Sequence, residues 1–371
     1  MYLLIYLYIF IIRIVYFFFK FFKTKNKIVF ISRQSNKPSL DFIMLEEEVL
    51  KQNQNIKIVM LTKKVEKNIK SVLKNTFMLF KQLYHLATSK ICITDGYNIT
   101  ISALQHKESL KIFQIWHSLG AIKKFGYDSL KTPKDRKIAR IMAMHKNYNY
   151  VNCSSDSMKK YFSKAFGYND DYLIPFGLPR VDYIITKENI LKKRIYNKYP
   201  EFKRKKVILY APTFRDNNNY KINELISEID FNKYILLLKL HPNTKIEIEN
   251  KNVYTCKEFN ALSLIAVSDY IITDYSGIAI EALALSKPVY LYVYDIEEYS
   301  NYPGLNLDLY QEFKGLTFKS PHKLFQSISR NCYDKKVIEK LKRKYIVSTN
   351  GDVTKNLVKF ILEKGECTNE K

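Results

Sequence analysis

The chain of 371 residues has few cysteines, few glycines and comparatively few acidic residues. Its five cysteines are scattered without a CxxC pair, which argues against a disulfide framework and against a cysteine-based zinc site. The 36 acidic residues are outnumbered by 61 lysines and arginines, so the net charge is +25. This surplus favours anionic partners, but the lysines are spread along the chain and no nucleic-acid-binding signature accompanies them. We therefore expect anionic substrates or an anionic membrane surface, and no nucleic acid.

The first 22 residues contain no acidic residue and are almost entirely apolar or aromatic, interrupted only by Arg13 and Lys20. No charged region precedes them and no small-residue cleavage site follows, which argues against a cleaved secretory signal. The length is close to the ~20 residues of a membrane span, but a central arginine costs roughly 2.5–3.5 kcal/mol there. Two interpretations stay open, a single span or a helix lying in the membrane interface; a buried first helix ranks below both. Either membrane arrangement leaves the remaining chain on the cytoplasmic face, next to Lys23, Lys25 and Lys27.

After this segment, short apolar runs alternate with helical stretches, which predicts an α/β chain with parallel sheets. The strands expected in the first half are 28–32, 56–61, 91–95, 110–116, 151–154 and 172–174. Those expected in the second half are 206–210, 234–240, 253–254, 270–274 and 288–292. A charged stretch at 187–206 is the expected linker region. We predict a hydrophobic membrane-associating segment at 1–26 and two Rossmann-like domains at 27–186 and 187–371.

Polar motifs follow four of these strands, at the ends where parallel sheets bind ligands. The motifs are Trp116-His117, Thr213-Phe214-Arg215, His241-Pro242 and Asp274-Tyr275-Ser276-Gly277. Four such motifs at strand ends are harder to explain by chance than one. We therefore expect the carboxyl ends of both sheets to face a common crevice that holds the substrate.

The first motif combines a histidine with a basic turn. His117 can exchange protons near neutral pH, and Lys123 and Lys124 can hold a phosphorylated substrate. The alternative is a histidine that caps a loop or packs against Trp116. Arg180 either contacts substrate or pairs with Asp182.

The motifs of the second half predict an anion site. Arg215, beside the hydroxyl of Thr213, can bind an anionic oxygen with its forked guanidinium, unless it is only an exposed loop residue. Ser276 can cap a helix whose start, with Gly277, favours a phosphate. Glu281 either reaches ribose hydroxyls or only complements the helix dipole.

The ordered motifs together resemble the CDP-glycerol glycerophosphotransferase family, whose enzymes build teichoic-acid-like and capsular polymers. The resemblance covers residues 90 to 300. The segments that carry it are Trp116-His117 to Gly126, Ser154-Ser155, Gly177 to Asp182, Tyr210 to Arg215, Lys239 to Pro242 and Thr273 to Ser276.

This resemblance implies a GT-B fold at the membrane surface, a CDP-alcohol donor and the release of CMP. The domain at 27–186 would then serve the acceptor, and the domain at 187–371 would bind the nucleotide donor. The family's histidines map onto His117, as the base, and onto His241, at the donor phosphates. Lys239, Asp274 and Ser276 would lie on the donor side, and Trp116 on the acceptor side. The expected reaction transfers glycerol phosphate, or a related alditol phosphate, to a lipid-linked or polymer acceptor without a cofactor or metal. The alternative is a GT-B glycosyltransferase that uses a nucleotide sugar.

Overall fold

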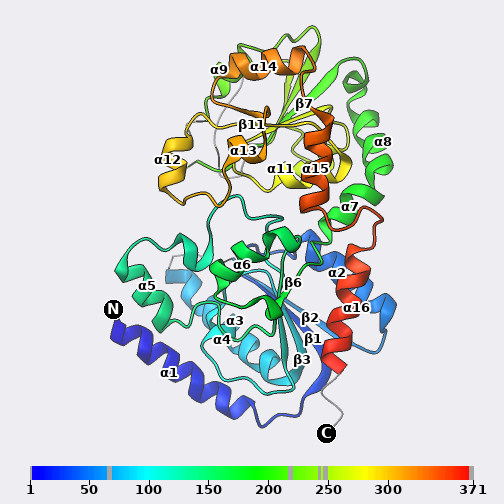
Figure 1. The fold of residues 1–371 in the computed structure, drawn as a ribbon. Coiled ribbons are helices and arrows are strands. Elements are labelled where there is room, and N and C mark those ends of the chain that lie inside the picture. Colours follow the sequence, from blue (N-terminus) through cyan, green and yellow to red (C-terminus); the bar gives the residue numbers. More distant parts are fainter. Residues whose placement is uncertain (1, 65–68, 216–219, 241–243, 245–249, 367–371) are drawn as a thin grey trace. The chain divides into compact units, whose positions relative to one another are not determined.

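The structure, a computed structural model, describes residues 2–64, 69–215, 220–240, 244 and 250–366. The chain forms two compact units, each built around one sheet (Figure 1). The first unit comprises the chain up to Ser118, Phe125–Arg180 and the stretch from Asp352 onward. The second comprises Leu119–Lys124 and Val181–Gly351.

The first unit contains a six-stranded parallel sheet in the order β2-β1-β3-β4-β5-β6. Its strands are β1 (Lys25–Ser32), β2 (Lys57–Thr62), β3 (Ser89–Thr94), β4 (Lys111–Gln114), β5 (Tyr150–Asn152) and β6 (Leu173–Ile174). Its helices are α1 (Tyr2–Phe19), α2 (Leu40–Gln52), α3 (Ile69–Thr88), α4 (Ile99–Ser102), α5 (Pro133–Ile141), α6 (Lys159–Phe166) and α16 (Val353–Glu366).

The second unit repeats the plan with a sheet in the order β12-β11-β10-β7-β8-β9, again parallel throughout. Its strands are β7 (Lys206–Tyr210), β8 (Tyr234–Leu238), β9 (Val253–Tyr254), β10 (Tyr270–Thr273), β11 (Val289–Tyr292) and β12 (Thr317–Phe318). Its helices are α8 (Glu188–Lys198), α9 (Ile222–Ile226), α10 (Ala261–Ile265), α11 (Ile278–Glu281), α12 (Ile296–Asn301), α13 (Leu309–Glu312), α14 (Pro321–Ser329) and α15 (Lys335–Tyr345). Between the two sheets in sequence runs α7 (Arg180–Thr186).

The eleven expected strands and the α/β class with two parallel sheets are confirmed, and the short β12 is an addition. The central strands were recognisable because both of their faces are buried, so they consist of continuous apolar runs rather than alternating ones. In β1, the run Ile28 to Ile31 is at most 1% exposed at any residue. Polar residues at each end of such a run mark where the strand leaves the core.

The last helix differs from the predicted extent of the second domain, which ran to residue 371. α16 belongs to the first unit, where its apolar face packs against β3, β4 and α2. Leu357, Val358 and Ile361 are fully buried on that face. Gly365 lies against Ile91 of β3, where an added Cβ would meet the isoleucine side chain at 2.4 Å. An amphipathic helix shows in its sequence that it must cover a sheet, but not which of two sheets it covers.

Each sheet has a switch point, where the chain reverses the direction in which it adds strands. In the first unit it lies between β1 and β3, and in the second between β7 and β10. At such points, loops diverge from the carboxyl ends of neighbouring strands and leave space for a ligand. The polar motifs of each unit gather around its switch point.

Candidate functional site

The site of the first unit lies just beyond the ends of β1, β3 and β4. Asp95 is the first residue after β3, and its Oδ2 accepts a hydrogen bond of 2.8 Å from Ser32 Oγ at the end of β1. The chain beyond β4 continues beside β3, because the Ile115 amide donates to the carbonyl of Thr94 at 2.8 Å. His117 follows two residues later, at the level of Asp95.

His117 is held by the backbone of β3. Its Nδ1 lies 2.9 Å from the carbonyl oxygen of Asp95. A carbonyl can only accept, so this bond requires the proton on Nδ1 and leaves the basic lone pair on Nε2. The side-chain amide nitrogen of Gln34, near the end of β1, lies 3.3 Å from the same Nδ1, but it cannot donate to a protonated Nδ1, so this is a contact and not a second hydrogen bond. The ring is half-buried and its tautomer is fixed, as in a general base.

Trp116 adopts a left-handed backbone conformation (φ +58°), which is rare for a bulky residue and costs on the order of 1–3 kcal/mol. Its amide donates to Oε1 of Gln114 at 2.8 Å. Its ring stacks on Phe125 with 4.9 Å between centroids and meets Phe166 edge-on at 5.3 Å. This packing fixes the backbone directly before His117. A contact of Trp116 with the acceptor stays a prediction.

Asp95 carries a buried carboxyl group of its own. Its Oδ1 has no hydrogen-bond partner among the residues that the structure describes, and the side chain is almost fully buried. Burial raises the pKa of this carboxyl to about 6, and the nearby charge of Asp41 adds to the rise, whereas the bond from Ser32 lowers it. The folded protein therefore holds a proton here at pH values where the unfolded chain has lost it.

Replacing Asp95 with asparagine should stabilise the protein at neutral pH by roughly 2–3 kcal/mol. Between pH 4 and pH 6 the wild-type folded state binds more protons than the unfolded state, so wild-type stability falls as pH rises through that window. The gain from Asp95→Asn should therefore grow from pH 4 to pH 7 and then level off. Urea unfolding at several pH values measures it, with the exposed Asp171→Asn as control. A gain that does not vary with pH would contradict the assignment.

Arg180 forms a forked ion pair with the buried Asp41 at the start of α2. Its Nε and Nη2 lie 3.0 and 2.5 Å from Asp41 Oδ2, and its backbone amide donates to Oδ1 at 2.9 Å. The partners are 139 positions apart, so the sequence could not reveal the pair. This pairing orients the guanidinium. Whether Arg180 also contacts substrate stays a prediction.

The site of the second unit centres on Arg215, which is buried rather than exposed. Its Nη2 donates to Asp274 Oδ2 at 2.8 Å, its Nε to Asp295 Oδ2 at 2.8 Å, and its Nη1 to the carbonyl of Thr213 at 2.8 Å. Only 7% of the side chain is exposed. Burial disfavours the charge, but Asp274 and Asp295 outweigh it and raise the pKa of Arg215. The guanidinium is thus largely occupied by protein groups.

Thr213 and Asp274 join the two strands at the switch point. The backbone amide and hydroxyl of Thr213, after β7, donate to Asp274 Oδ1 at 2.9 and 2.7 Å. The amide of Tyr275 donates to the same oxygen at 2.6 Å, and its hydroxyl donates to Asp295 Oδ1 at 3.0 Å. Asp274 therefore ties together the loops after β7 and β10. The structure brings Thr213, Arg215 and Asp274 into one cluster, as their strand-end positions predict.

The segment 119–124, which continues from His117, belongs to the second unit. Gly120 has φ +80°, and a Cβ there would lie 2.1 Å from Ile280 of α11, so only glycine fits. The amide of Lys124 donates to the carbonyl of Gly304 at 2.9 Å. The glycine-punctuated turn of the motif is thus explained by close packing on α11.

Lys123 lies close enough to Asp274 and Arg215 to feel their charges. Its backbone carbonyl accepts from Asn306 Nδ2 at 3.0 Å. Burial lowers the pKa of its amine, the charge of Asp274 offsets part of this, and that of Arg215 adds to it. A half-buried lysine beside a carboxylate that Arg215 already neutralises has the character of an anion ligand.

The helix that follows Ser276-Gly277 is short. α11 has four residues and continues as a 3₁₀ turn, Ala282–Leu285. Ser276 Oγ lies 3.5 Å from the Ile278 amide, and Ser276 and Gly277 are half-buried at the helix start. Glu281 is only 5% exposed. A helix of this length has a weak dipole. Binding of a phosphate at its start would therefore depend mainly on hydrogen bonds from individual backbone amides.

The remaining predicted donor residues are only partly described. Lys239 donates to the carbonyl of Cys256 at 3.1 Å, and burial lowers the pKa of its amine. His241 lies outside the described residues, so its predicted phosphate contact is not tested. In the described ranges, no three His, Cys, Asp or Glu side chains are grouped so that they could hold a metal ion.

Four residues of these clusters were not predicted as site residues: Gln34, Asp41, Asp95 and Asp295. Asp95 directly follows β3, so its strand-end position was a signal. Gln34 and Asp295 each lie two or three residues beyond a strand, after β1 and β11, and that position was a signal for them. Asp41 lies in the first turn of α2, where an acidic residue is ordinary. Its pairing with Arg180 therefore had no sequence signal.

The sequence profile of the CDP-Glycerol:Poly(glycerophosphate) glycerophosphotransferase family matches residues 13–363. The teichoic acid ribitol-phosphate primase of Bacillus spizizenii is 30% identical over 91% of this chain and 90% of its own length. The teichoic acid glycerol-phosphate primase of Bacillus subtilis is 32% identical over 78% of this chain and 77% of its own length. The B. spizizenii poly(ribitol-phosphate) polymerase is 29% identical, and the chain spans 56% of its length.

Solved structures agree on the fold. The wall teichoic acid polymerase TagF superposes with a TM-score of 0.74 over 94% of this chain and 91% of that chain, at 20% identity. A UDP-GlcNAc 2-epimerase from Neisseria meningitidis superposes with a TM-score of 0.57 at 15% identity over 91% of this chain and 100% of its own. At these identities the likeness shows a shared GT-B-like architecture and no more.

The family match and the primase identities decide the reaction class, which the fold alone leaves open between a phosphotransferase and a nucleotide-sugar enzyme. The predicted enzyme class, a transferase that moves an alditol phosphate from a CDP-alcohol in teichoic acid synthesis, is confirmed. The chain belongs to the CDP-glycerol:poly(glycerophosphate) glycerophosphotransferase family.

Proposed function

We propose that this chain transfers glycerol phosphate or ribitol phosphate from the CDP-alcohol to a hydroxyl of a membrane-linked teichoic acid acceptor, with His117 as the general base. Relatives named for ribitol phosphate and for glycerol phosphate match at 30% and 32% identity, so both donors belong in the test. The observation that carries the role of His117 is its Nδ1 bond to the Asp95 carbonyl, which puts the basic lone pair on Nε2.

In the proposed step, the acceptor oxygen attacks the phosphorus that bears the alditol. The bond between this phosphorus and the oxygen of CMP breaks, and CMP leaves with the electron pair. The acceptor proton passes to Nε2 of His117. Positioning and charge stabilisation supply most of the rate in phosphoryl transfer, so the base contributes only part of it.

In the second unit, we assign the donor's phosphates to Lys123, Lys124 and the amides at Ser276-Gly277, with His241 as a further predicted contact. Lys123 is half-buried beside Asp274, and no ion pair with a described acidic residue neutralises Lys124. Arg215 acts through Asp274 as a positioning residue, since its guanidinium is largely occupied. Thr213 shares that role through its two bonds to Asp274.

We further propose that α1 lies in the plane of the cytoplasmic membrane surface rather than across the membrane. Among the described residues, α1 is the one helix long and apolar enough to cross a membrane. One face packs on the first unit: Ile12 and Tyr16 are buried, and Arg13 Nε donates to the carbonyl of Ala103 at 3.0 Å. A spanning helix would lose these contacts and carry Arg13 into hydrocarbon.

The opposite face of α1 is apolar and exposed. The large exposed side chains on this face, with those just after the helix, are Leu3, Tyr6, Leu7, Phe10, Ile11, Ile14, Phe17, Phe18, Phe21 and Phe22. A patch of this extent on a protein of net charge +25 is typical of a membrane-surface helix on anionic lipid.

Replacing Phe17 and Phe18 together with serine should weaken binding to anionic lipid vesicles at least roughly tenfold. Both side chains are more than half exposed, so the unfolding temperature should stay the same. Co-sedimentation with vesicles measures the partition, and Tyr172→Ser, on the same unit, is the matched control. Unchanged partition of the double variant would contradict the in-plane helix.

The experiment that tests the proposed function is a donor panel. Purified full-length protein on vesicles is given CDP-glycerol, CDP-ribitol, UDP-glucose or UDP-N-acetylglucosamine, with and without a lipid-linked primed acceptor. We expect CMP release from a CDP-alcohol that depends on the acceptor. Release of UDP from a sugar donor, with no turnover of either CDP-alcohol, would reject the proposal and favour the glycosyltransferase alternative.

A further inference from the structure

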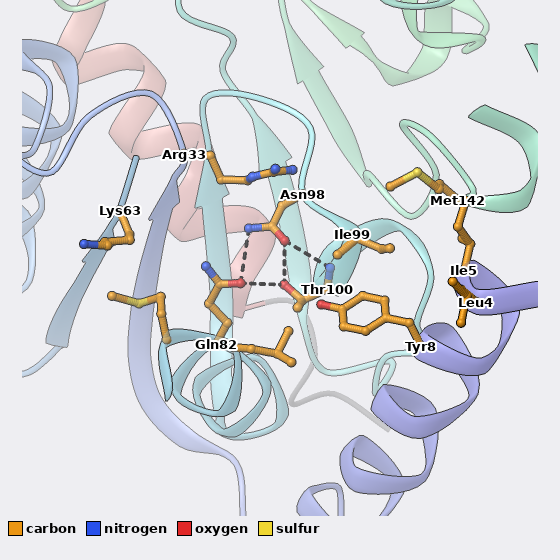
Figure 2. A pocket seen from close by; sticks show the side chains of 12 residues that line it. Leu4, Ile5, Tyr8, Arg33, Lys63, Gln82, Asn98, Ile99, Thr100 and Met142 are labelled. Carbon is orange, nitrogen blue, oxygen red and sulfur yellow. Dashed lines mark hydrogen bonds between the residues drawn. The ribbon is translucent and has the colours of Figure 1, made fainter. Parts of the chain in front are cut away.

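The first unit contains a cavity of about 490 Å³ between α1, α3 and the switch point of the sheet. This volume lies within the usual range of small-molecule sites, about 300–1,000 Å³. Figure 2 shows side chains from α1, from the start of α4 and from the loop after β1 converging on it. The cavity is partly open to solvent.

The walls of the cavity differ in chemistry from one side to the other. Leu4 and Ile5 of α1, with Leu79 of α3, Ile99 and Met142, make the lining predominantly apolar. The polar part contains Arg33, at the end of β1, and Lys63, at the end of β2. A cavity that is apolar over most of its wall and cationic at one part suits a molecule with a hydrocarbon chain and an anionic head.

Three further polar residues of the cavity are satisfied by one another. Asn98 Nδ2 donates to Gln82 Oε1 at 3.3 Å, and Thr100 Oγ1 lies 3.0 Å from the same oxygen. The Thr100 amide donates to Asn98 Oδ1 at 3.0 Å. This buried trio, drawn with dashed lines in Figure 2, needs no ligand to satisfy it. These three side chains form a polar part of the cavity wall beside Arg33.

Within the part of the chain that the structure describes, no carboxylate neutralises Arg33. It is half-buried, and its Nη1 makes one long contact of 3.4 Å with the carbonyl of Tyr97. No acidic residue in the described ranges forms an ion pair with Arg33 or with Lys63. Figure 2 shows the Arg33 guanidinium reaching over Asn98. A partly buried guanidinium with no carboxylate partner among the described side chains is suited to the forked recognition of a phosphate.

Residues close in sequence to two lining residues contact the proposed base. Gln34, the residue after Arg33, lies 3.3 Å from Nδ1 of His117. Asn98 follows three residues after Asp95, whose carbonyl holds the same Nδ1. On the other side, α1 supplies the apolar wall with Leu4, Ile5 and Tyr8, and its outer face is the proposed membrane surface. The cavity therefore connects the membrane-facing helix with the loops that position His117.

We propose that this cavity binds the lipid phosphate of the acceptor, with the phosphate at Arg33 and the hydrocarbon chain against α1. The proposal rests on the proposed function, because it names where that reaction's lipid-linked substrate is held. The polymer end that carries the reacting hydroxyl would extend from Arg33 toward His117. Bulk membrane phospholipid is the competing occupant, and the test separates the two.

The first test measures binding without turnover. Radiolabelled dodecyl phosphate, below its micellar concentration, is titrated into the full-length protein, with dodecanol and inorganic phosphate as competitors. We expect Arg33→Gln to weaken binding roughly tenfold to a hundredfold, and Leu79→Trp, which fills the apolar part, to weaken it similarly. Arg194→Gln, an exposed arginine on α8, is the matched control and should bind as the wild type does. Equal affinity of the wild type and both cavity variants would overturn the proposal.

The second test uses transfer. Arg33→Gln should raise the KM for the lipid-linked acceptor at least tenfold and leave the KM for the CDP-alcohol unchanged. A water-soluble acceptor without the lipid phosphate should be used equally well by both proteins. Loss of vesicle binding by Arg33→Gln, or displacement of dodecyl phosphate by phosphatidylglycerol as readily as by the acceptor, would assign the cavity to bulk phospholipid and overturn the proposal.

The two proposals fail in different ways. If no CDP-alcohol is turned over but dodecyl phosphate binds in an Arg33-dependent manner, the proposed function falls and the lipid-phosphate site stands. If transfer occurs but Arg33→Gln leaves both dodecyl phosphate binding and the acceptor KM unchanged, the cavity proposal falls alone.

Discussion

Replacing His117 with alanine is expected to lower kcat for alditol phosphate transfer roughly 100- to 10,000-fold, the usual contribution of a general base. The ring is half-buried and is fixed through Nδ1 by a backbone carbonyl, so its loss removes the proton acceptor without disturbing a packed core. The KM for the CDP-alcohol should change little, because no donor contact is assigned to His117. Release of CMP with saturating donor and acceptor measures the effect.

The control for this variant is His322→Ala, since His322 lies exposed on α14 and pairs only with Glu228 in the described contacts. Activity of His322→Ala should match that of the wild type. In the wild type, kcat/KM should fall on the acid side, because protonation of Nε2 removes the base, and this limb should disappear in the residual activity of His117→Ala. Full activity of His117→Ala would assign proton removal to another group.

Replacing Arg215 with methionine should destabilise the second unit by about 3–5 kcal/mol, the usual cost of breaking a buried ion pair from one side. The substitution leaves Asp274 and Asp295 buried without the guanidinium that neutralises both. Removal of the bond to the Thr213 carbonyl adds to the loss. Urea unfolding followed by circular dichroism measures the free energy of unfolding of this unit.

Arg204→Met, at an exposed arginine of the same unit, is the matched control and should cost less than about 0.5 kcal/mol. Adding Asp295→Asn to Arg215→Met should recover part of the lost stability, because it removes one of the two buried carboxylate charges that Arg215 no longer neutralises. If Arg215→Met instead left stability unchanged and only weakened binding of the CDP-alcohol, Arg215 would be a direct phosphate ligand, as its motif suggested.

Much of the fold was predictable because its signals are local. A strand buried on both faces consists of consecutive apolar residues, and β1, β7, β8 and β10 all show this in the sequence. The strand-end positions of His117, Thr213 and Asp274 were predictable for the same reason. Once the parallel sheets were inferred, these residues had to lie at the carboxyl edges, where ligands bind.

The partners of these residues were not predictable, because each depends on contacts between distant parts of the chain. The sequence predicted Arg215 as an anion ligand, with an exposed loop residue as the alternative, but Asp295, 80 positions later, helps to bury it. Asp41 pairs with Arg180 over a still longer separation. Likewise, the pattern of α16 indicated a buried face without indicating that the face covers the first sheet. Sequence periodicity indicates which face of a helix or strand is buried. Only the topology determines which other element that face packs against.

The N-terminal helix is an intermediate case. Its composition predicted membrane contact and left open a span or an in-plane arrangement. The contacts of Arg13 with Ala103, and of Tyr16 with His106 at 2.8 Å, decide which face of α1 packs on the protein. They could not be read from the sequence, because nothing local marks the loop after α4 as the surface that receives this helix.

The most direct test of the account follows the transferred phosphate itself. CDP-glycerol or CDP-ribitol, labelled with ³²P in the phosphate next to the alditol, is mixed with excess protein on vesicles and with the lipid-linked acceptor, and the reaction is stopped within one turnover. Label should appear on the lipid in step with CMP, with none on the protein, because His117 takes only a proton. Label trapped on His117 would show a phosphorylated histidine and contradict the general base. Label released as free alditol phosphate would contradict transfer altogether.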